Sequence, residues 1–221
     1  HRIAGREISG DGRLRDIVGA RLPFSLTTGQ QAAIADIEAD LGQPHRMLRL
    51  LQGDVGSGKT VVALYAMLIA IEAGSQGALM APTELLARQH HATLEKLLEE
   101  SGVTVALLTG RGKKTEREAL LRRLAAGEID IVIGTHALFQ SGVDFADLAL
   151  AVVDEQHRFG VHQRMTLAAK GKGVDVLVMT ATPIPRTLML TAYGDLQSSR
   201  LHEKPAGRAA IQTRVLPIDR L

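Results

Sequence analysis

A chain of 221 residues with 45% hydrophobic side chains can build one large α/β domain or two small ones, which excludes wholesale disorder. The absence of Cys excludes a disulfide scaffold and a cysteine zinc site. The sequence has 26 basic and 24 acidic side chains, so its net charge is only +2. This excludes bulk positive charge as a means of binding nucleic acid. Any such binding must come from a local arrangement of charges.

The predicted elements alternate between strands and helices along the middle of the chain. Residues 1–25 are less regular and are predicted to be a lead-in. Helical periods cover Thr83–Glu100, whose leucines share one face, and Glu116–Leu124, which is charged outside and leucine-rich inside. Apolar runs of strand length lie at Met47–Leu51, Ala78–Ala81, Val103–Leu108, Ile129–Gly134, Leu148–Asp154 and Asp175–Thr180.

Several of these strands are continuous aliphatic runs, such as LALAVV and VDVLVM. This pattern is typical of strands buried on both faces of a parallel sheet. Right-handed crossovers then predict an α/β domain over residues 26–198, with a three-layer, doubly wound, mostly parallel sheet. From about Ser199 the alternation ends, so residues 199–221 are predicted to be a linker and a first strand of another unit at Ile211–Pro217.

The two ends and the hydropathy of the chain bear on its origin and location. The sequence starts at His1 and stops soon after a strand-like run, so we expect a fragment of a longer protein. No signal peptide is visible, and no apolar run reaches the roughly 20 residues that span a bilayer. We therefore expect a soluble, cytoplasmic protein.

A glycine-rich stretch after the first predicted strand fits the pattern G-x-x-x-x-G-K-[ST] and opens a helix. Its residues are Gly53, Asp54, Val55, Gly56, Ser57, Gly58, Lys59 and Thr60. Glycines allow backbone N–H groups to surround phosphate oxygens, and the start of a helix adds partial positive charge. Lys59 is predicted to reach the β- and γ-phosphates, and the Thr60 hydroxyl to bind Mg²⁺. The sequence therefore predicts a nucleotide site.

A P-loop also needs a carboxylate that holds its metal, at the end of a neighbouring buried strand. Asp154 ends an aliphatic run, where it is predicted to hold Mg²⁺ through water, and Glu155 is predicted to orient and deprotonate an attacking water. A Glu beside the metal Asp favours an NTPase over a kinase. His157 alone indicates only packing or surface, and His90 and His91, as helix neighbours, do not form a metal pair.

Four motifs occur in the order found in the first motor domain of superfamily 2 helicases, namely GDVGSGKT, APTELLARQH, DEQH and TATPIPRT. Within that class, LPFSLTTGQQ, IVIGTHALFQ and AVVDEQHRFGVHQR resemble the RecG family of branch-migration helicases, from about Leu22 to Leu221. Transcription-repair coupling factors have a very similar motor and are the nearest alternative. Their motifs are expected to carry an aromatic residue and a Glu where this chain has Ser57 and Gln156.

The resemblance implies a RecA-like domain that uses ATP and Mg²⁺ and acts as an ATP-dependent DNA helicase. It implies that Gln30 reads the adenine edge. It also implies that Thr180, Ala181 and Thr182 couple hydrolysis to DNA movement, with hydroxyls directed toward the segment from Asp154 to His157, which would give His157 a role in the same network. The positions that match DNA-contacting motifs are Pro82, Thr83, Arg88, Gly110, Arg111, Lys113, Thr135 and His136.

The resemblance further implies partners that this sequence lacks. A second RecA-like domain would supply arginines to the ATP site, and an upstream wedge domain would recognise branched double-stranded DNA at forks and junctions. We therefore expect the fragment alone to hydrolyse ATP slowly, and the whole protein to regress stalled forks in the bacterial cytoplasm, at the nucleoid, without a membrane partner.

Two alternatives from other classes remain at this stage. A small-molecule kinase would need a lid and an acceptor site, whereas a nucleotide-sensing interaction module would need the P-loop but not Glu155.

Overall fold

The computed structural model describes residues 3–110, 113–154, 171, 173–182 and 196–202. Its helices are α1 (Arg13–Arg21), α2 (Thr28–Leu41), α3 (Lys59–Glu72), α4 (Glu84–Leu97), α5 (Lys114–Ala125) and the 3-10 helix η1 (His136–Phe139). Its strands are β1 (Leu48–Gly53), β2 (Gln76–Met80), β3 (Val105–Leu108), β4 (Ile131–Gly134), β5 (Leu148–Asp154), β6 (Asp175–Thr180) and β7 (Gln197–Leu201).

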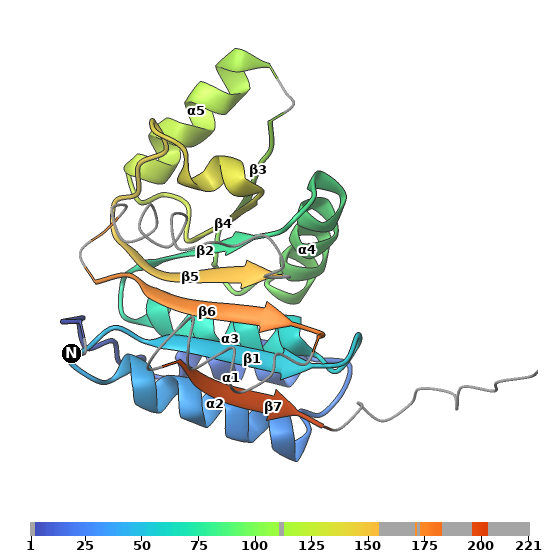
Figure 1. The fold of residues 1–221 in the computed structure, drawn as a ribbon. Coiled ribbons are helices and arrows are strands. Elements are labelled where there is room, and N and C mark those ends of the chain that lie inside the picture. Colours follow the sequence, from blue (N-terminus) through green and yellow to red (C-terminus); the bar gives the residue numbers. More distant parts are fainter. Residues whose placement is uncertain (1–2, 111–112, 155–170, 172, 183–195, 203–221) are drawn as a thin grey trace, which may run out of the picture.

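The strands form one sheet of seven in the order β3-β4-β2-β5-β6-β1-β7, as Figure 1 shows. Each pairing between these strands is parallel. This confirms the predicted α/β class with a doubly wound parallel sheet. All predicted strands between residues 47 and 180 are present, with ends that differ by at most two residues.

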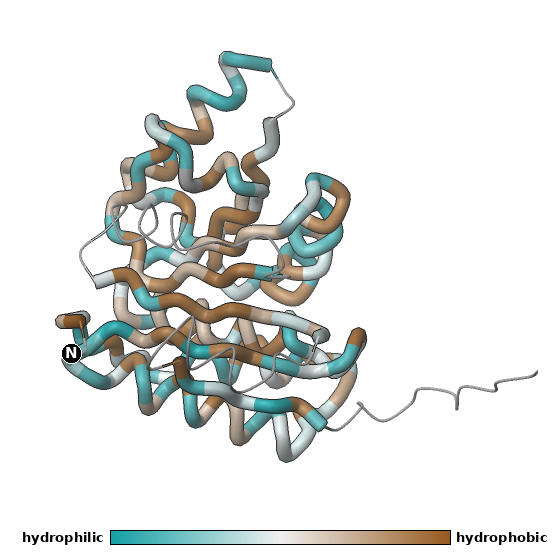
Figure 2. The backbone as a smooth tube through the Cα atoms, in the orientation of Figure 1, coloured by the Kyte–Doolittle hydropathy of each residue, from teal (hydrophilic) through white to brown (hydrophobic). Residues whose placement is uncertain are grey.

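The apolar core lies on both faces of the sheet. Residues of α1 to α4 pack with Leu51, Leu79 and Val152 on one face, and α5 and η1 pack with Ala78 and Val153 on the other. Figure 2 shows the central strands as mostly hydrophobic along their length, as expected for strands covered on two sides. In the part of the chain that the structure describes, no helix is long and apolar enough to cross a membrane.

Helix α1 is a correction to the irregular lead-in predicted for residues 1–25. Its Leu14 and Val18 are buried in the same core as α3. The carboxylate of Glu72, at the end of α3, accepts backbone N–H bonds from Gly12, Leu14 and Arg15 at 3.0, 2.8 and 3.1 Å. An acidic group at this position satisfies the donors that a helix leaves unpaired at its start and also favours its dipole.

Strand β7 crosses the domain boundary predicted at residues 198 and 199, so the sheet of this α/β domain extends to Leu201. Arg49 of β1, 6% exposed, anchors this strand: its guanidinium donates to Ser199 Oγ at 2.7 Å and to the side-chain oxygen of Gln197. The same guanidinium donates to Asp40 of α2 at 2.8 Å. Because β7 is held by polar side chains, the aliphatic pattern that identified the other strands does not occur in it.

Candidate functional site: the phosphate loop and the carboxyl edge of the sheet

The predicted phosphate loop connects the end of β1 to the start of α3. Gly56 and Gly58 adopt left-handed backbone angles, with φ of 78° and 87°. Gly58 is also the N-cap of α3, and no side chain caps this helix start. A long buried helix whose first N–H groups lack a side-chain partner is suited to bind an anion there.

Side chains around the loop hold it in this shape. Lys59 folds back across it and donates from Nζ to the backbone oxygens of Gly53 at 2.6 Å and Asp54 at 3.0 Å. A Cβ on Gly53 would lie 2.5 Å from Ser57 Oγ and 3.0 Å from the Cβ of Leu201, so a larger residue there would displace the Ser57 side chain. The buried Ser57 hydroxyl has no hydrogen-bond partner among the described residues. The loop therefore has the glycines, the cation and an uncommitted hydroxyl that a phosphate site requires.

Gln30 contacts the loop directly. Its side chain is fully buried, its Oε1 accepts from Thr27 N at 2.9 Å, and its Nε2 donates to Ser57 O at 2.8 Å. The first of these bonds completes a capping box at the start of α2. In this structure the amide supports the loop from behind, and the base-reading role stays a prediction that requires these contacts to be exchanged.

Asp154 lies at the end of β5, on the carboxyl edge of the sheet. The strand register places it level with Met179 of β6, which is in turn level with Leu51 of β1. Since Val152 belongs to the core under α1 to α4, alternation along the strand places Asp154 on the same face as α3. The predicted metal carboxylate and the phosphate loop therefore share one edge and one face.

The donor set at this edge suits Mg²⁺, which is usually held by one or two protein groups together with substrate phosphates and water. Thr60, the second residue of α3, offers a half-buried hydroxyl, and Asp154 offers a carboxylate. Among the described residues no group of three or more His, Cys, Asp or Glu side chains gathers as a metal cage. Glu155 and His157 lie outside the described residues, so their predicted roles stay predictions.

The residues predicted to couple hydrolysis to movement lie at the end of β6. The hydroxyls of Thr180 and Thr182 are 3.0 Å apart and bond to one another, and Ala181 lies between them. Thr180 alternates with Met179, so it lies on the sheet face opposite Asp154. Gln52, level with Thr180 on β1, donates to the backbone oxygen of Thr182 at 3.1 Å. This contact joins the two strands just before the phosphate loop.

The predicted DNA-contacting positions follow β2, β3 and β4, at the half of the carboxyl edge away from β1. The register that pairs Met80 and Leu108 with Gly134 places these strand ends side by side. The exposed members include Pro82, Thr83, Arg88, Gly110, Lys113 and His136, Thr135 is half-buried, and Arg111 lies outside the described residues. The guanidinium of Arg88 already pairs with Glu84 at 2.8 Å.

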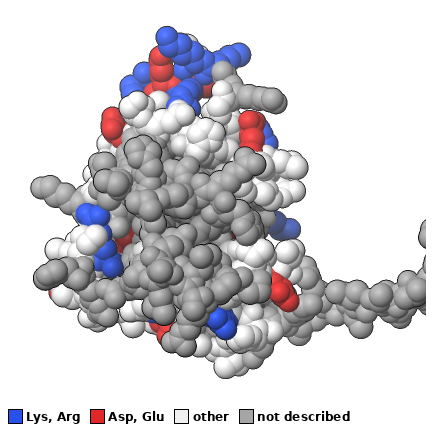
Figure 3. Space-filling model, in the orientation of Figure 1, with Lys and Arg blue, Asp and Glu red and all other residues white. Residues whose placement is uncertain are grey.

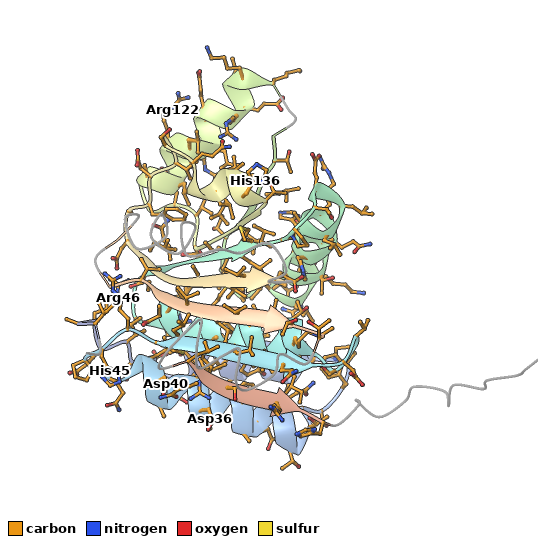
Figure 4. The ribbon with its side chains drawn as sticks, viewed as in Figure 1. Asp36, Asp40, His45, Arg46, Arg122 and His136 are labelled. Atoms are coloured by element: carbon orange, nitrogen blue, oxygen red, sulfur yellow. The ribbon has the colours of Figure 1, made fainter. Side chains whose placement is uncertain are left out.

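Basic side chains gather at this end of the molecule. Figure 3 shows Lys and Arg concentrated over α5, with some acidic groups between them. Figure 4 places His136 and Arg122 at this end, far from Asp36 and Asp40 on α2. Lys113 and Lys114 are 82% and 89% exposed. The predicted nucleic-acid contacts at Lys113 and His136 therefore lie at a local basic surface (Figure 3 and Figure 4), and a chain with a net charge of only +2 would need such a surface to bind nucleic acid.

His90 is a site residue that the sequence reading missed. Its Nε2 lies 2.7 Å from Asp154 Oδ2. In the sequence His90 stands out only as the neighbour of His91, with which it does not form a metal pair. Its spacing of four residues from both Leu86 and Leu94 places it on the inward face of α4, a signal that was available.

A helicase family model and several relatives match the chain. The model, described as DEAD/DEAH box helicase, matches residues 27–191. The chain is 57% identical over 192 residues to the ATP-dependent DNA helicase RecG of Bacillus subtilis (strain 168), covering 87% of this chain and 28% of that protein. It is 46% identical over 220 residues to the ATP-dependent DNA helicase RecG of Escherichia coli O157:H7, covering 98% and 32%.

Solved structures agree with this similarity. A structure of RecG bound to a three-way DNA junction matches with a TM-score of 0.84 and 44% identity, covering 98% of this chain and 29% of that one. The DEAD-box helicase Mss116 bound to ssRNA and UDP-BeF matches with a TM-score of 0.69 at 18% identity, covering 91% and 47%, which supports the RecA-like fold alone. The chain spans between 28% and 32% of the length of the two curated relatives.

Proposed function

Because the chain belongs to the DEAD/DEAH box helicase family, we propose that it is the ATP-binding motor domain of a RecG-type DNA helicase. The observation that carries the proposal is the geometry of one sheet edge. There the start of α3, which has no side-chain cap, lies with Lys59 and Asp154 at one edge and on one face of the sheet, where β6 separates β1 from β5. A nucleoside triphosphate presents the anionic groups and the metal that this combination of donors and carboxylate accepts.

Each residue has a defined task in the proposed site. The N–H groups at the start of α3 bind phosphate oxygens, and Lys59 exchanges its bonds to the loop carbonyls for the β- and γ-phosphates. Thr60 and Asp154 hold Mg²⁺, which would neutralise charge on the phosphates. Glu155 follows Asp154 in the sequence and takes the proton from the attacking water.

We further propose that the whole protein acts on branched double-stranded DNA, regressing stalled forks and branch-migrating junctions in recombination and repair. The supports are the high identity to RecG proteins and the likeness to RecG bound to a three-way DNA junction. A second RecA-like domain and a wedge domain act in the same polypeptide, and the protein works at the bacterial nucleoid in the cytoplasm. The loops after β2, β3 and β4 contact DNA phosphates, which makes binding independent of base sequence and sensitive to salt.

The test is a titration of the 221-residue chain with a fluorescent ATP analogue, with Mg²⁺ and with EDTA. Wild-type chain and Lys114→Ala should bind saturably and more tightly with Mg²⁺, whereas Lys59→Ala should lose binding. Lys114 is a matched control because it also starts a helix, α5, but its side chain is 89% exposed and lies outside the proposed site. Equal binding by the wild-type chain and Lys59→Ala would contradict the proposed site, and so would no binding by the wild-type chain.

A further inference from the structure

Helix α4 touches the proposed metal carboxylate through one side chain. His90 Nε2 lies 2.7 Å from Asp154 Oδ2, and the two side chains are only 13% and 11% exposed. Along α4, His90 is flanked on its inward face by Ala87 and Leu94, both fully buried in the core under the sheet. The imidazole is therefore held between α4 and the end of β5, with little freedom to turn away.

The chemistry of the pair fixes the direction of the hydrogen bond. An ionised carboxylate only accepts, so Nε2 carries the hydrogen and donates it to Oδ2. Within the described residues, the hydrogen bond of this carboxylate is the one that Oδ2 accepts from His90, and Oδ1 takes no part in it. One oxygen is thus engaged by the protein, and the other is left to accept from a metal-bound water or to bind the metal itself.

We propose that His90 is a positioning residue for Asp154, which orients Oδ1 of that carboxylate toward the Mg²⁺ of the nucleotide. The inference rests on the proposed function of the site. Hydrogen bonds to the groups that ligate a metal fix their rotation, and removing such a bond typically weakens metal binding or activity by about 10- to 100-fold. His90 itself touches neither nucleotide nor metal in this arrangement.

Substitutions at His90 and at its neighbour His91 give a matched set of variants for the test. In His90→Gln the side-chain Nε2 reaches about as far from the backbone as the imidazole Nε2, so a donor remains near Oδ2. In His90→Asn the amide is one bond shorter, and in His90→Ala the donor is absent. His91→Ala is the control, because His91 is the next residue on α4 and pairs at 3.7 Å with the exposed Glu95 instead. Asp154→Asn removes the carboxylate that is proposed to hold Mg²⁺, so it gives the reference value for complete loss of the Mg²⁺ effect on binding.

The measurement is the Mg²⁺ concentration that half-saturates tight binding of the fluorescent ATP analogue, together with its affinity in EDTA. His90→Ala and His90→Asn should raise the Mg²⁺ requirement by about 10-fold or more, and His90→Gln and His91→Ala should stay near wild type. Affinity in EDTA should be the same for all folded variants, because the phosphate loop is intact. Thermal melting identifies the variants that fold. If His90→Ala does not fold, the comparison of His90→Gln with His90→Asn is enough to test the proposal.

Two results would overturn the inference while the proposed function stands. One is an unchanged Mg²⁺ requirement in His90→Asn beside a raised one in Asp154→Asn. The other is a loss of affinity that is equal in EDTA and in Mg²⁺, which indicates general damage rather than positioning. If the wild-type chain itself binds the analogue without any Mg²⁺ effect, the metal site fails, and the role of His90 fails with it.

Discussion

The side-chain amide of Gln30 donates to the backbone oxygen of Ser57 across 2.8 Å, and so helix α2 supports the phosphate loop from below. The same amide accepts from the N–H of Thr27, so one buried side chain satisfies two backbone groups that belong to different elements. Gly58 completes the arrangement, since a Cβ there would lie 2.1 Å from Gln30 Nε2.

Replacing Gln30 by Ala is expected to destabilise the chain by about 1–3 kcal/mol for each buried group left without its partner. Gln31→Ala is the control, because that side chain is exposed and donates only to the backbone oxygen of Leu26. Urea unfolding of both variants measures the difference. A Gln30→Ala variant as stable as Gln31→Ala would show that the amide contributes nothing to the native state.

A pH dependence is expected from Asp175, at the start of β6. Burial raises the pKa of this carboxyl from 3.8 to about 7, although a bond from Met47 N at 2.6 Å and nearby Arg6 and Arg46 lower it. The folded protein therefore binds more protons than the unfolded chain between about pH 4 and pH 7, so its stability falls as the pH rises through this range and levels off above it.

Asp175→Asn should remove that loss, because the amide has no charge to bury. The variant should gain stability relative to wild type as the pH rises from 5 to 7, by on the order of a few kcal/mol in full. Melting temperatures across this range give the measurement, with the exposed Asp144→Asn as the control. A wild-type minus variant difference that is the same at all pH values would contradict the raised pKa.

Glu72 is expected to hold α1 on the domain. Its carboxylate is almost fully buried and accepts from backbone groups of α1 and from Arg15 Nε at 3.1 Å. Glu72→Ala leaves these donors unpaired and should destabilise the chain by about 3–5 kcal/mol. Hydrogen exchange should show protection lost first in α1. Glu95→Ala, which removes an exposed carboxylate from α4, should change neither stability nor exchange in α1.

Glu155→Gln separates a motor from a nucleotide-sensing module. In a polypeptide that contains both motor domains, the variant should lose ATP hydrolysis and keep analogue binding, since only the base is removed. The isolated chain should hydrolyse ATP slowly in any case, because arginines supplied from another domain contribute about 10³–10⁵ in rate. Strong, DNA-stimulated turnover by the 221-residue chain alone would contradict this last expectation.

The parts of the fold that sequence could predict are those with local signals. The aliphatic run of Leu148–Asp154 and the glycines before Lys59 each carry their own pattern, and the strands and the loop lie where these patterns placed them. Helix α1 and strand β7 depend on distant partners. Leu14 bonds to a carboxylate 58 residues away, and Ser199 bonds to Arg49, 150 residues away. A pattern within a short stretch of sequence gives no information about partners this far away along the chain.

In the candidate site too, local sequence signals predicted some residues, and others depend on contacts with distant parts of the chain. The motif placed Lys59 and Asp154 at the sheet edge, but the partner of Asp154 comes from α4, 64 residues earlier. The inward position of His90 was readable from the helix period, whereas its hydrogen bond depends on the tertiary packing that brings α4 to the carboxyl end of β5. For Gln30, the family resemblance implies an amide that reads the adenine edge; the structure shows this amide bonded to Ser57, a contact between distant segments that no local pattern contains, and the base-reading role stays a prediction.

The parallel pairing of β7 with β1 has a mechanical consequence. Arg49 lies opposite Gln197 and Gly53 opposite Leu201, so both strands end at the same edge. A pull on the carboxyl end of β7 along the strand axis would load the β1–β7 ladder in shear, rather than open its hydrogen bonds one after another. A load applied in this way would reach β1, the strand that leads into the phosphate loop.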